Sequence, residues 1–157
     1  MWRIRWRSCT SGCSRRLEAC CSLAFISRHC PGAPPLSEQA VLLCGSAELC
    51  DGGMAVPFDV QYAGQVCRAF AIRYQGVVHA YLNRCTHVPM EMDYQPNRLF
   101  DDTGQWLLCA THGAAYLPST GQCAGGPCRG GLVKIALSEA GGQVHWHTAH
   151  NLQPVAF

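Results

Sequence analysis

Apolar and polar residues alternate along much of the chain after residue 40, with the period of two that is typical of half-buried β-strands. Residues 56–60, Val-Pro-Phe-Asp-Val, are the clearest case, and residues 41–44 predict one more short strand. Further stretches predict hairpins, because two apolar segments flank a short turn rich in glycine or aspartate. These hairpins are expected at residues 70–82, 98–108 and 132–147. Successive hairpins with little helical periodicity predict an all-β, antiparallel fold.

The first 39 residues do not share this pattern. They carry six arginines against two glutamates, and five of the twelve cysteines of the chain. The apolar stretch behind a twin-arginine signal at Arg15-Arg16 is short and begins only after Glu18. A lipobox at residues 17–20 has this glutamate where a small residue is needed, and no apolar segment precedes it. A transit peptide is a third hypothesis. We favour a disordered or mis-annotated extension over residues 1–39, followed by one folded domain over 40–150 and a C-terminal tail over 151–157.

Charge and hydropathy narrow the class of protein. Residues 40–157 carry six basic and eight acidic side chains, so no basic surface for nucleic acid is predicted. No apolar run approaches the roughly 18–20 residues that cross a bilayer. Seven cysteines remain after residue 40, an odd number that suits a reducing compartment and metal ligation better than a complete set of disulfides. We therefore expect a soluble, cytoplasmic protein with neither membrane nor nucleic acid as a partner.

Two short loops after predicted strands each contain one cysteine and one histidine. The first has Cys85 and His87, and the second has Cys109 and His112, with 21 residues between His87 and Cys109. Two thiolates and two neutral imidazoles suit a [2Fe–2S] cluster, because replacing two cysteines by histidines removes negative charge and raises the reduction potential. Cysteine and histidine at short spacing also bind zinc, which is the competing hypothesis.

The two half-motifs, Cys-Thr-His and Cys-x-x-His-Gly, are followed by an aromatic residue, a Thr-Gly pair and a Gly-Pro pair, at Tyr116, residues 120–121 and residues 126–127. In order and spacing, residues 40–150 resemble the Rieske [2Fe–2S] domain. The resemblance implies a Rieske-type antiparallel β-sandwich with a small cluster-binding subdomain of two loops. It also implies one [2Fe–2S] cluster with four metal ligands: Cys85, His87, Cys109 and His112. The cysteines would bind the inner iron and the histidines the outer one.

The resemblance further implies roles for residues around the ligands. The Tyr116 hydroxyl would donate to a cysteine sulfur, and the loop at Gly126 and Pro127 would cover the cluster. A zinc site explains neither feature, so we favour the cluster. Met90, Thr111 and Ala114 stand where high-potential members have a disulfide between the loops and a serine hydroxyl. Loss of these groups predicts a potential in the lower part of the Rieske range of about −150 to +300 mV.

The remaining cysteines and histidines are expected to be structural. Cys123 and Cys128 bracket the cover loop, where a disulfide is geometrically allowed, but a reducing compartment favours two free thiols. His145 and His147 share one face of a predicted strand, which we attribute to an exposed edge strand rather than to a second metal site. We expect the other three cysteines to pack as small apolar groups: Cys44, Cys50 and Cys67.

The predicted function is one-electron transfer by a soluble, ferredoxin-like carrier that serves an oxygenase or another redox partner and receives electrons from a reductase. Docking is expected at the histidine edge, on a small apolar patch formed by Val88, Pro89, Met90 and Ala114. The alternative is an accessory subunit of a larger reductase, or a cluster-based redox sensor. The residues after His112 leave no room for the mononuclear iron domain of an oxygenase, so we expect no catalytic activity from this chain alone.

Overall fold

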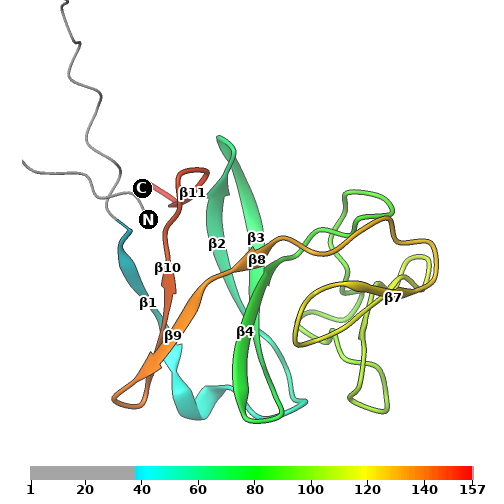
Figure 1. Cartoon of the computed structure of the whole chain (residues 1–157), viewed down its shortest axis with the longest axis horizontal. Helices are drawn as coiled ribbons and strands as arrows, with labels where there is room; N and C mark the ends of the chain where they lie inside the picture. Colours follow the sequence, from blue (N-terminus) through cyan, green and yellow to red (C-terminus); the bar gives the residue numbers. More distant parts are fainter. Residues whose placement is uncertain (1–37, 157) are drawn as a thin grey trace, which may run out of the picture. The chain divides into compact units, whose positions relative to one another are not determined.

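The computed structural model describes residues 38–156, so nearly all of the predicted N-terminal extension lies outside the described residues. The described part consists of strands and the loops between them, with one three-residue 3₁₀ helix, and the all-β prediction is confirmed (Figure 1). In chain order the elements are β1 (Ala40–Gly45), the short 3₁₀ helix η1 (Ser46–Glu48), β2 (Val56–Tyr62), β3 (Gln65–Tyr74), β4 (Val77–Leu82), β5 (Leu107–Leu108), β6 (Ala115–Tyr116), β7 (Cys123–Gly125), β8 (Lys134–Ile135), β9 (Leu137–Ala140), β10 (Gln143–His147) and β11 (Leu152–Pro154).

These strands form three antiparallel sheets. The first has the order β1-β10-β9, the second β11-β2-β3-β4-β8 and the third β5-β6-β7. The first two pack face to face as the predicted β-sandwich, because inward side chains from both contribute to one hydrophobic core. Val60 and Leu82 come from the second sheet, and Val144 and Trp146 from the first. The third sheet is small and lies next to the candidate metal ligands.

The hairpins follow the predicted pattern in part. The first arm of the hairpin expected at residues 132–147 is divided, because β8 pairs with β4 in the second sheet and only β9 pairs with β10. β3 and β4 form a regular hairpin, and so do β9 and β10. The hairpin expected at residues 98–108 is reduced to a short pairing around Phe100 and Leu107. Leu99, Phe100 and Leu107 are buried in a second hydrophobic core, and Asp101 accepts backbone hydrogen bonds from the turn. Burial of these side chains and the hydrogen bonds of Asp101 therefore fix the conformation of this segment, in place of the longer antiparallel strand pairing that was expected.

Two predictions about cysteines and histidines outside the ligand motifs are wrong. β10, which carries His145 and His147, is the middle strand of its sheet and not an edge, because β1 pairs along its outer side. Both histidines are half-buried. Cys50 is exposed and belongs to neither hydrophobic core of the described residues. Cys44, by contrast, is buried as expected.

The C-terminal strand β11 pairs with β2, so residues 152–154 belong to the five-stranded sheet, although the domain was predicted to end at residue 150.

Among residues 38–156, no helix is long and apolar enough to cross a membrane.

Arg73 on β3 connects the two large sheets. Its Nε donates to the carbonyl oxygen of Leu49 at 2.8 Å, and its Nη2 lies 2.6 Å from a carboxylate oxygen of Glu139 on β9. Ser46 donates a further hydrogen bond to Glu139. These hydrogen bonds, first from Arg73 and then from Ser46, lower the pKa of Glu139 below its usual 4.5.

We expect Arg73→Met to lower the free energy of unfolding by about 1–2 kcal/mol at neutral pH, between the values for exposed and buried ion pairs. Because the pKa of Glu139 is lower in the folded state, its charged form stabilises the fold above about pH 4.5. This contribution is lost as the pH falls through the lowered pKa. Urea unfolding of both proteins at pH 7 and pH 3 checks this, and a difference that stays the same at both pH values would contradict it.

Candidate metal centre

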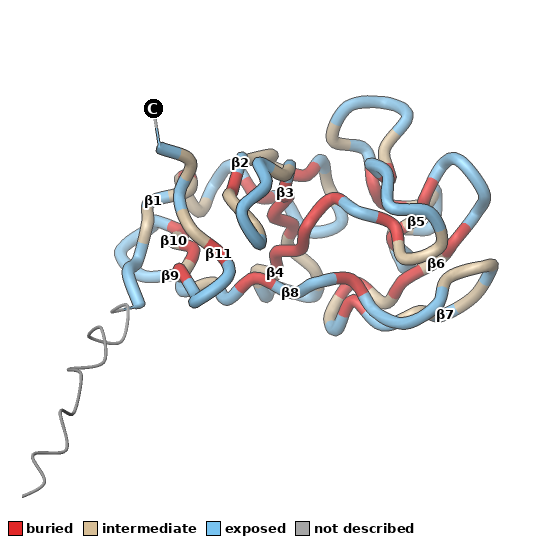
Figure 2. Tube along the Cα trace, turned by 90° about the horizontal axis from the view of Figure 1, so that it is seen from above, coloured by how far each residue is buried: buried red, intermediate tan, exposed pale blue. Residues whose placement is uncertain are grey.

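The candidate ligands lie on two loops at the end of the domain that carries β5, β6 and β7. In Figure 2 this end lies opposite β1, β9 and β10. The first cluster loop, residues 83–92, leaves β4, and the second, residues 109–114, connects β5 to β6. Each loop is closed by its own backbone: the Cys85 N–H donates to Met90 O at 2.9 Å, and the Cys109 N–H donates to Ala114 O at 2.8 Å. The cysteine of each loop is thereby held at its base.

The structure arranges the four predicted ligands in two layers. Cys85 and Cys109 are free and buried, with exposures of only 3 % and 1 %. His87 is half-buried and His112 is exposed. The two imidazole rings meet edge to face, with centroids 4.9 Å apart and an angle of 87° between their planes. A thiol pair thus lies in the interior, and a histidine pair lies nearer to the surface.

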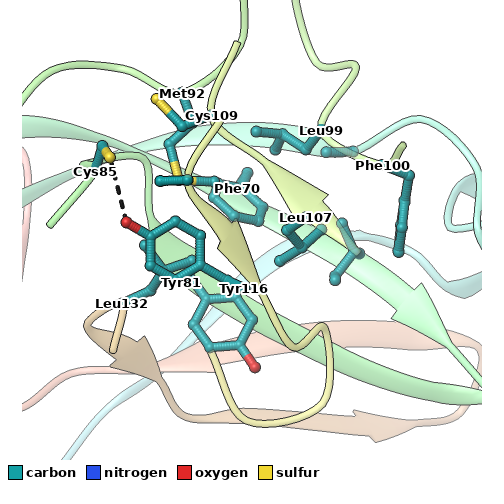
Figure 3. Packing of buried hydrophobic residues seen from close by; sticks show 13 residues of the cluster. Phe70, Tyr81, Cys85, Met92, Leu99, Phe100, Leu107, Cys109, Tyr116 and Leu132 are labelled. Carbon is teal, nitrogen blue, oxygen red and sulfur yellow. Dashed lines mark hydrogen bonds between the residues drawn. The ribbon is translucent and has the colours of Figure 1, made fainter. Parts of the chain in front are cut away.

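The surroundings of Cys85 favour its thiolate form. Burial alone raises the pKa of this thiol, but hydrogen bonds lower it further than burial raises it. The Tyr116 hydroxyl lies 3.2 Å from Cys85 Sγ (dashed line in Figure 3), and the N–H groups of His87 and Val88 also point at this sulfur. Because thiolates and not thiols bind metals, the site is prepared for a metal or cluster.

His87 carries an unusual buried atom. Within the described part of the chain, its Nδ1 is shielded from solvent and has no hydrogen-bond partner. A buried polar atom without a partner costs about 1–3 kcal/mol and calls for an explanation such as a missing ion. An imidazole nitrogen is a suitable donor to iron, and His87 lies two residues after the buried thiol of Cys85, so the residues fit the predicted group.

The donor set matches what a [2Fe–2S] cluster needs. Such a cluster takes four protein ligands, because each of its two irons is held by two of them. A cysteine pair and a separate histidine pair answer that demand.

Gly126 and Pro127 lie in the cover loop, which we define as residues 123–131. Gly126 has a φ of +75°, and a Cβ added there would lie 2.4 Å from the carbonyl oxygen of Gly113 in the second cluster loop. On the other flank, Arg129 N–H donates to Thr86 Oγ1 at 3.3 Å, and Thr86 Oγ1 donates to Gly130 O at 3.2 Å. The cover loop therefore contacts both cluster loops.

Two predictions about this region need correction. Ala114 was expected in the exposed apolar patch, but it is fully buried, because the cover loop lies over it. Cys123 and Cys128 were expected to be free thiols, but they form a disulfide. The turn between them brings their Cα atoms to 5.8 Å, which is the usual separation for a disulfide.

Sequence reasoning also missed the residues that tie the two cluster loops together. The Asn83 side chain donates to Asp93 at 2.6 Å and accepts the Met92 N–H at 2.8 Å. The Met92 carbonyl in turn accepts the Ala110 N–H at 2.8 Å, beside Cys109. These contacts position both loops, but a lone asparagine after a strand has no pattern that would have revealed this role.

A β-sandwich with two loops of this kind at one end defines a class of β-rich metalloproteins. The sequence matches the family model of the Rieske [2Fe–2S] domain over residues 39–136. The chain therefore belongs to the Rieske [2Fe–2S] domain family. No curated protein matches the sequence.

Solved structures with a similar fold include ferredoxins of dioxygenase systems. The ferredoxin of carbazole 1,9a-dioxygenase from Nocardioides aromaticivorans IC177 shares 20% identity over 68% of this chain and 95% of its own, with a TM-score of 0.55. The Sphingomonas yanoikuyae B1 ferredoxin shares 22% identity over 71% of this chain and 100% of its own, with a TM-score of 0.54. A complex of reduced oxygenase and oxidized ferredoxin in carbazole 1,9a-dioxygenase also matches, with 21% identity over 68% and 91% and a TM-score of 0.53.

Proposed function

We propose that this chain is a one-electron carrier that holds one [2Fe–2S] cluster through Cys85, His87, Cys109 and His112. The observation that carries the proposal is the buried thiol pair beneath two histidines, one of which has a buried Nδ1 that finds no partner in the described part of the chain. When bound, such a cluster supplies a centre that accepts and releases a single electron. Membership of the Rieske family supports this assignment.

The surrounding residues serve electron transfer in this proposal. Tyr116 and the loop N–H groups donate to the Cys85 sulfur and stabilise negative charge on it. Gly126 and Pro127 shield the site from water, while His112 lies at the surface. Ala114 offers no hydroxyl and Thr111 no sulfur, so we propose a potential in the lower part of the Rieske range.

The partner would dock beside the histidines. Val88 and Met90 are each 41 % exposed and lie next to His87, with Pro89 exposed between them. A small apolar patch of this kind suits a transient contact with another redox protein. Because similar structures include dioxygenase ferredoxins and an oxygenase–ferredoxin complex, we propose a reductase as the electron donor and an oxygenase as one class of acceptor.

The full-length purified protein tests this function. We expect a brown protein with visible charge-transfer bands and about two irons and two sulfides per chain, as a [2Fe–2S] cluster requires. We also expect it to accept electrons from a ferredoxin reductase and to pass them to an oxygenase. A colourless protein that binds zinc stoichiometrically would refute the cluster. Stable co-purification with one large partner would point to an accessory subunit instead of a carrier.

Tyr116→Phe tests the hydrogen bond to Cys85. Phenylalanine keeps the buried ring but removes the hydroxyl 3.2 Å from Sγ. A hydrogen bond worth about 1 kcal/mol corresponds to about 40 mV in a one-electron couple, because 1.4 kcal/mol equals about 59 mV. We therefore expect the reduction potential to fall by about 40 mV in protein-film voltammetry.

Tyr81→Phe is the matched control. Tyr81 is equally buried in the same core, but its hydroxyl donates to Pro118 O at 2.8 Å and to neither cysteine. This variant is expected to lose some stability and to keep the wild-type potential. Equal potentials for all three proteins would show that Tyr116 does not act on the cluster.

A further inference from the structure

We propose that the Cys123–Cys128 disulfide is a redox-sensitive latch that keeps the cover loop closed over the metal centre. The inference rests on the proposed cluster and adds a regulatory device to it. A dithiol reductant would open the latch: it gives two electrons to the disulfide, the S–S bond breaks, two protons complete two thiols, and the reductant becomes a disulfide. Opening would loosen the cover loop and expose the site.

The position of the disulfide is the first argument. It closes a ring of chain over residues 123–128, with Cα atoms 5.8 Å apart, and this ring contains Gly126, which touches the second cluster loop. β7 begins at Cys123, which pairs with Tyr116 on β6. Both cysteines are only half-buried, so a small reductant can reach them.

The contacts of the cover loop are the second argument. A chain of hydrogen-bonding groups runs from Arg129, the residue after Cys128, to the metal centre. The Arg129 N–H donates to Thr86 Oγ1, which lies 3.0 Å from the Tyr116 hydroxyl, which in turn lies 3.2 Å from Cys85 Sγ. Movement of the loop at Arg129 therefore breaks a contact that helps to orient Tyr116 toward the ligand sulfur.

The third argument is that the surroundings of Cys128 accommodate both the disulfide and the reduced thiol. Cys128 Sγ lies 3.1 Å from the Gly125 carbonyl oxygen and 3.5 Å from that of Ala115. A reduced Cys128 thiol thus has an acceptor within reach, and reduction strands no buried polar group. Reduction removes the covalent restraint on the cover loop. This loop is rich in glycine, which gains much conformational freedom when such a restraint is lost: Gly125, Gly126, Gly130 and Gly131.

The test treats the full-length protein with a dithiol and follows three readouts. Alkylation followed by peptide mass mapping reports Cys123 and Cys128, a ferrous-iron chelator reports release of iron, and hydrogen exchange reports the backbone around Thr86 and residues 129–131. We expect both cysteines to resist alkylation until the dithiol is added. Iron release should then become faster on the order of tenfold, as expected for loss of a disulfide across a short loop, and exchange should increase at these backbone positions.

The matched variants separate the latch from other effects of the reductant. Cys123→Ser with Cys128→Ser should release iron at the fast rate without dithiol and show no further response to it. Cys50→Ser, which removes an exposed free thiol elsewhere, should behave as wild type. Alkylation of Cys123 and Cys128 before reduction, or unchanged iron release and exchange after it, would overturn the latch. A protein without iron would contradict the proposed function alone, and hydrogen exchange would still decide on the latch.

Discussion

Cys109→Ser is expected to give a full-length, colourless protein that has lost at least nine-tenths of its iron. Cys109 is 1 % exposed and is held by its N–H bond to Ala114 O at the base of the second cluster loop. A serine hydroxyl does not ionise near neutral pH and is a poor substitute for a thiolate ligand to iron. If Cys109 is one of two cysteine ligands, as we propose, its removal leaves one iron without an adequate donor pair.

Cys44→Ser is the matched control for this experiment. Cys44 is also a free, buried cysteine, but it lies in the core between the two large sheets, away from both cluster loops. This control should lose some stability and keep its colour and iron. Visible absorption and iron analysis of both variants measure the effect. Retention of the wild-type spectrum by Cys109→Ser would remove Cys109 from the ligand set.

Gly126→Ala is expected to displace the cover loop, and this is the second large effect. The added Cβ would lie 2.4 Å from the Gly113 carbonyl oxygen and 3.1 Å from Ala114 Cα, and these are backbone atoms that cannot rotate away. The residue also has a φ of +75°, which costs a residue with a Cβ about 1–2 kcal/mol. Strain and overlap together predict a loss of about 3 kcal/mol of stability in the closed loop.

Gly125→Ala offers a control one residue away. A Cβ at Gly125 meets nothing within 4 Å, and its φ lies outside the left-handed region. We expect iron release to a chelator to be about tenfold faster or more for Gly126→Ala, and close to wild type for Gly125→Ala. Similar rates in both variants would mean that the cover loop does not close at Gly126.

The two half-motifs made much of the candidate site predictable. Each half-motif has its cysteine and histidine at a short spacing next to the end of a predicted strand: Cys85 with His87, and Cys109 with His112. So short a loop allows few arrangements of its two side chains other than side by side. The structure also places Tyr116 against Cys85, in the position that the resemblance implied. The alternation of apolar and polar residues likewise predicted the hairpins of the sandwich, because that pattern follows directly from the geometry of a strand.

Errors arose where the neighbour of a residue decides its role. Ala114 reads as an apolar surface residue until the cover loop is placed on top of it. His145 and His147 read as edge residues until β1 pairs with β10 from the far end of the domain. Composition argued for free thiols at Cys123 and Cys128, but the turn between them sets their separation at 5.8 Å.

The sequence by itself determined the all-β class, the resemblance to the Rieske domain and the candidate ligands, because these depend on local periodicity and on short spacings. Only the tertiary structure decided that the thiols lie beneath the histidines and that His87 Nδ1 is buried without a partner among residues 38–156. It also decided that the cover loop contacts both cluster loops, through Gly126 and Thr86. Burial and contacts between segments distant in sequence depend on how the sheets and loops pack, and no local pattern encodes them.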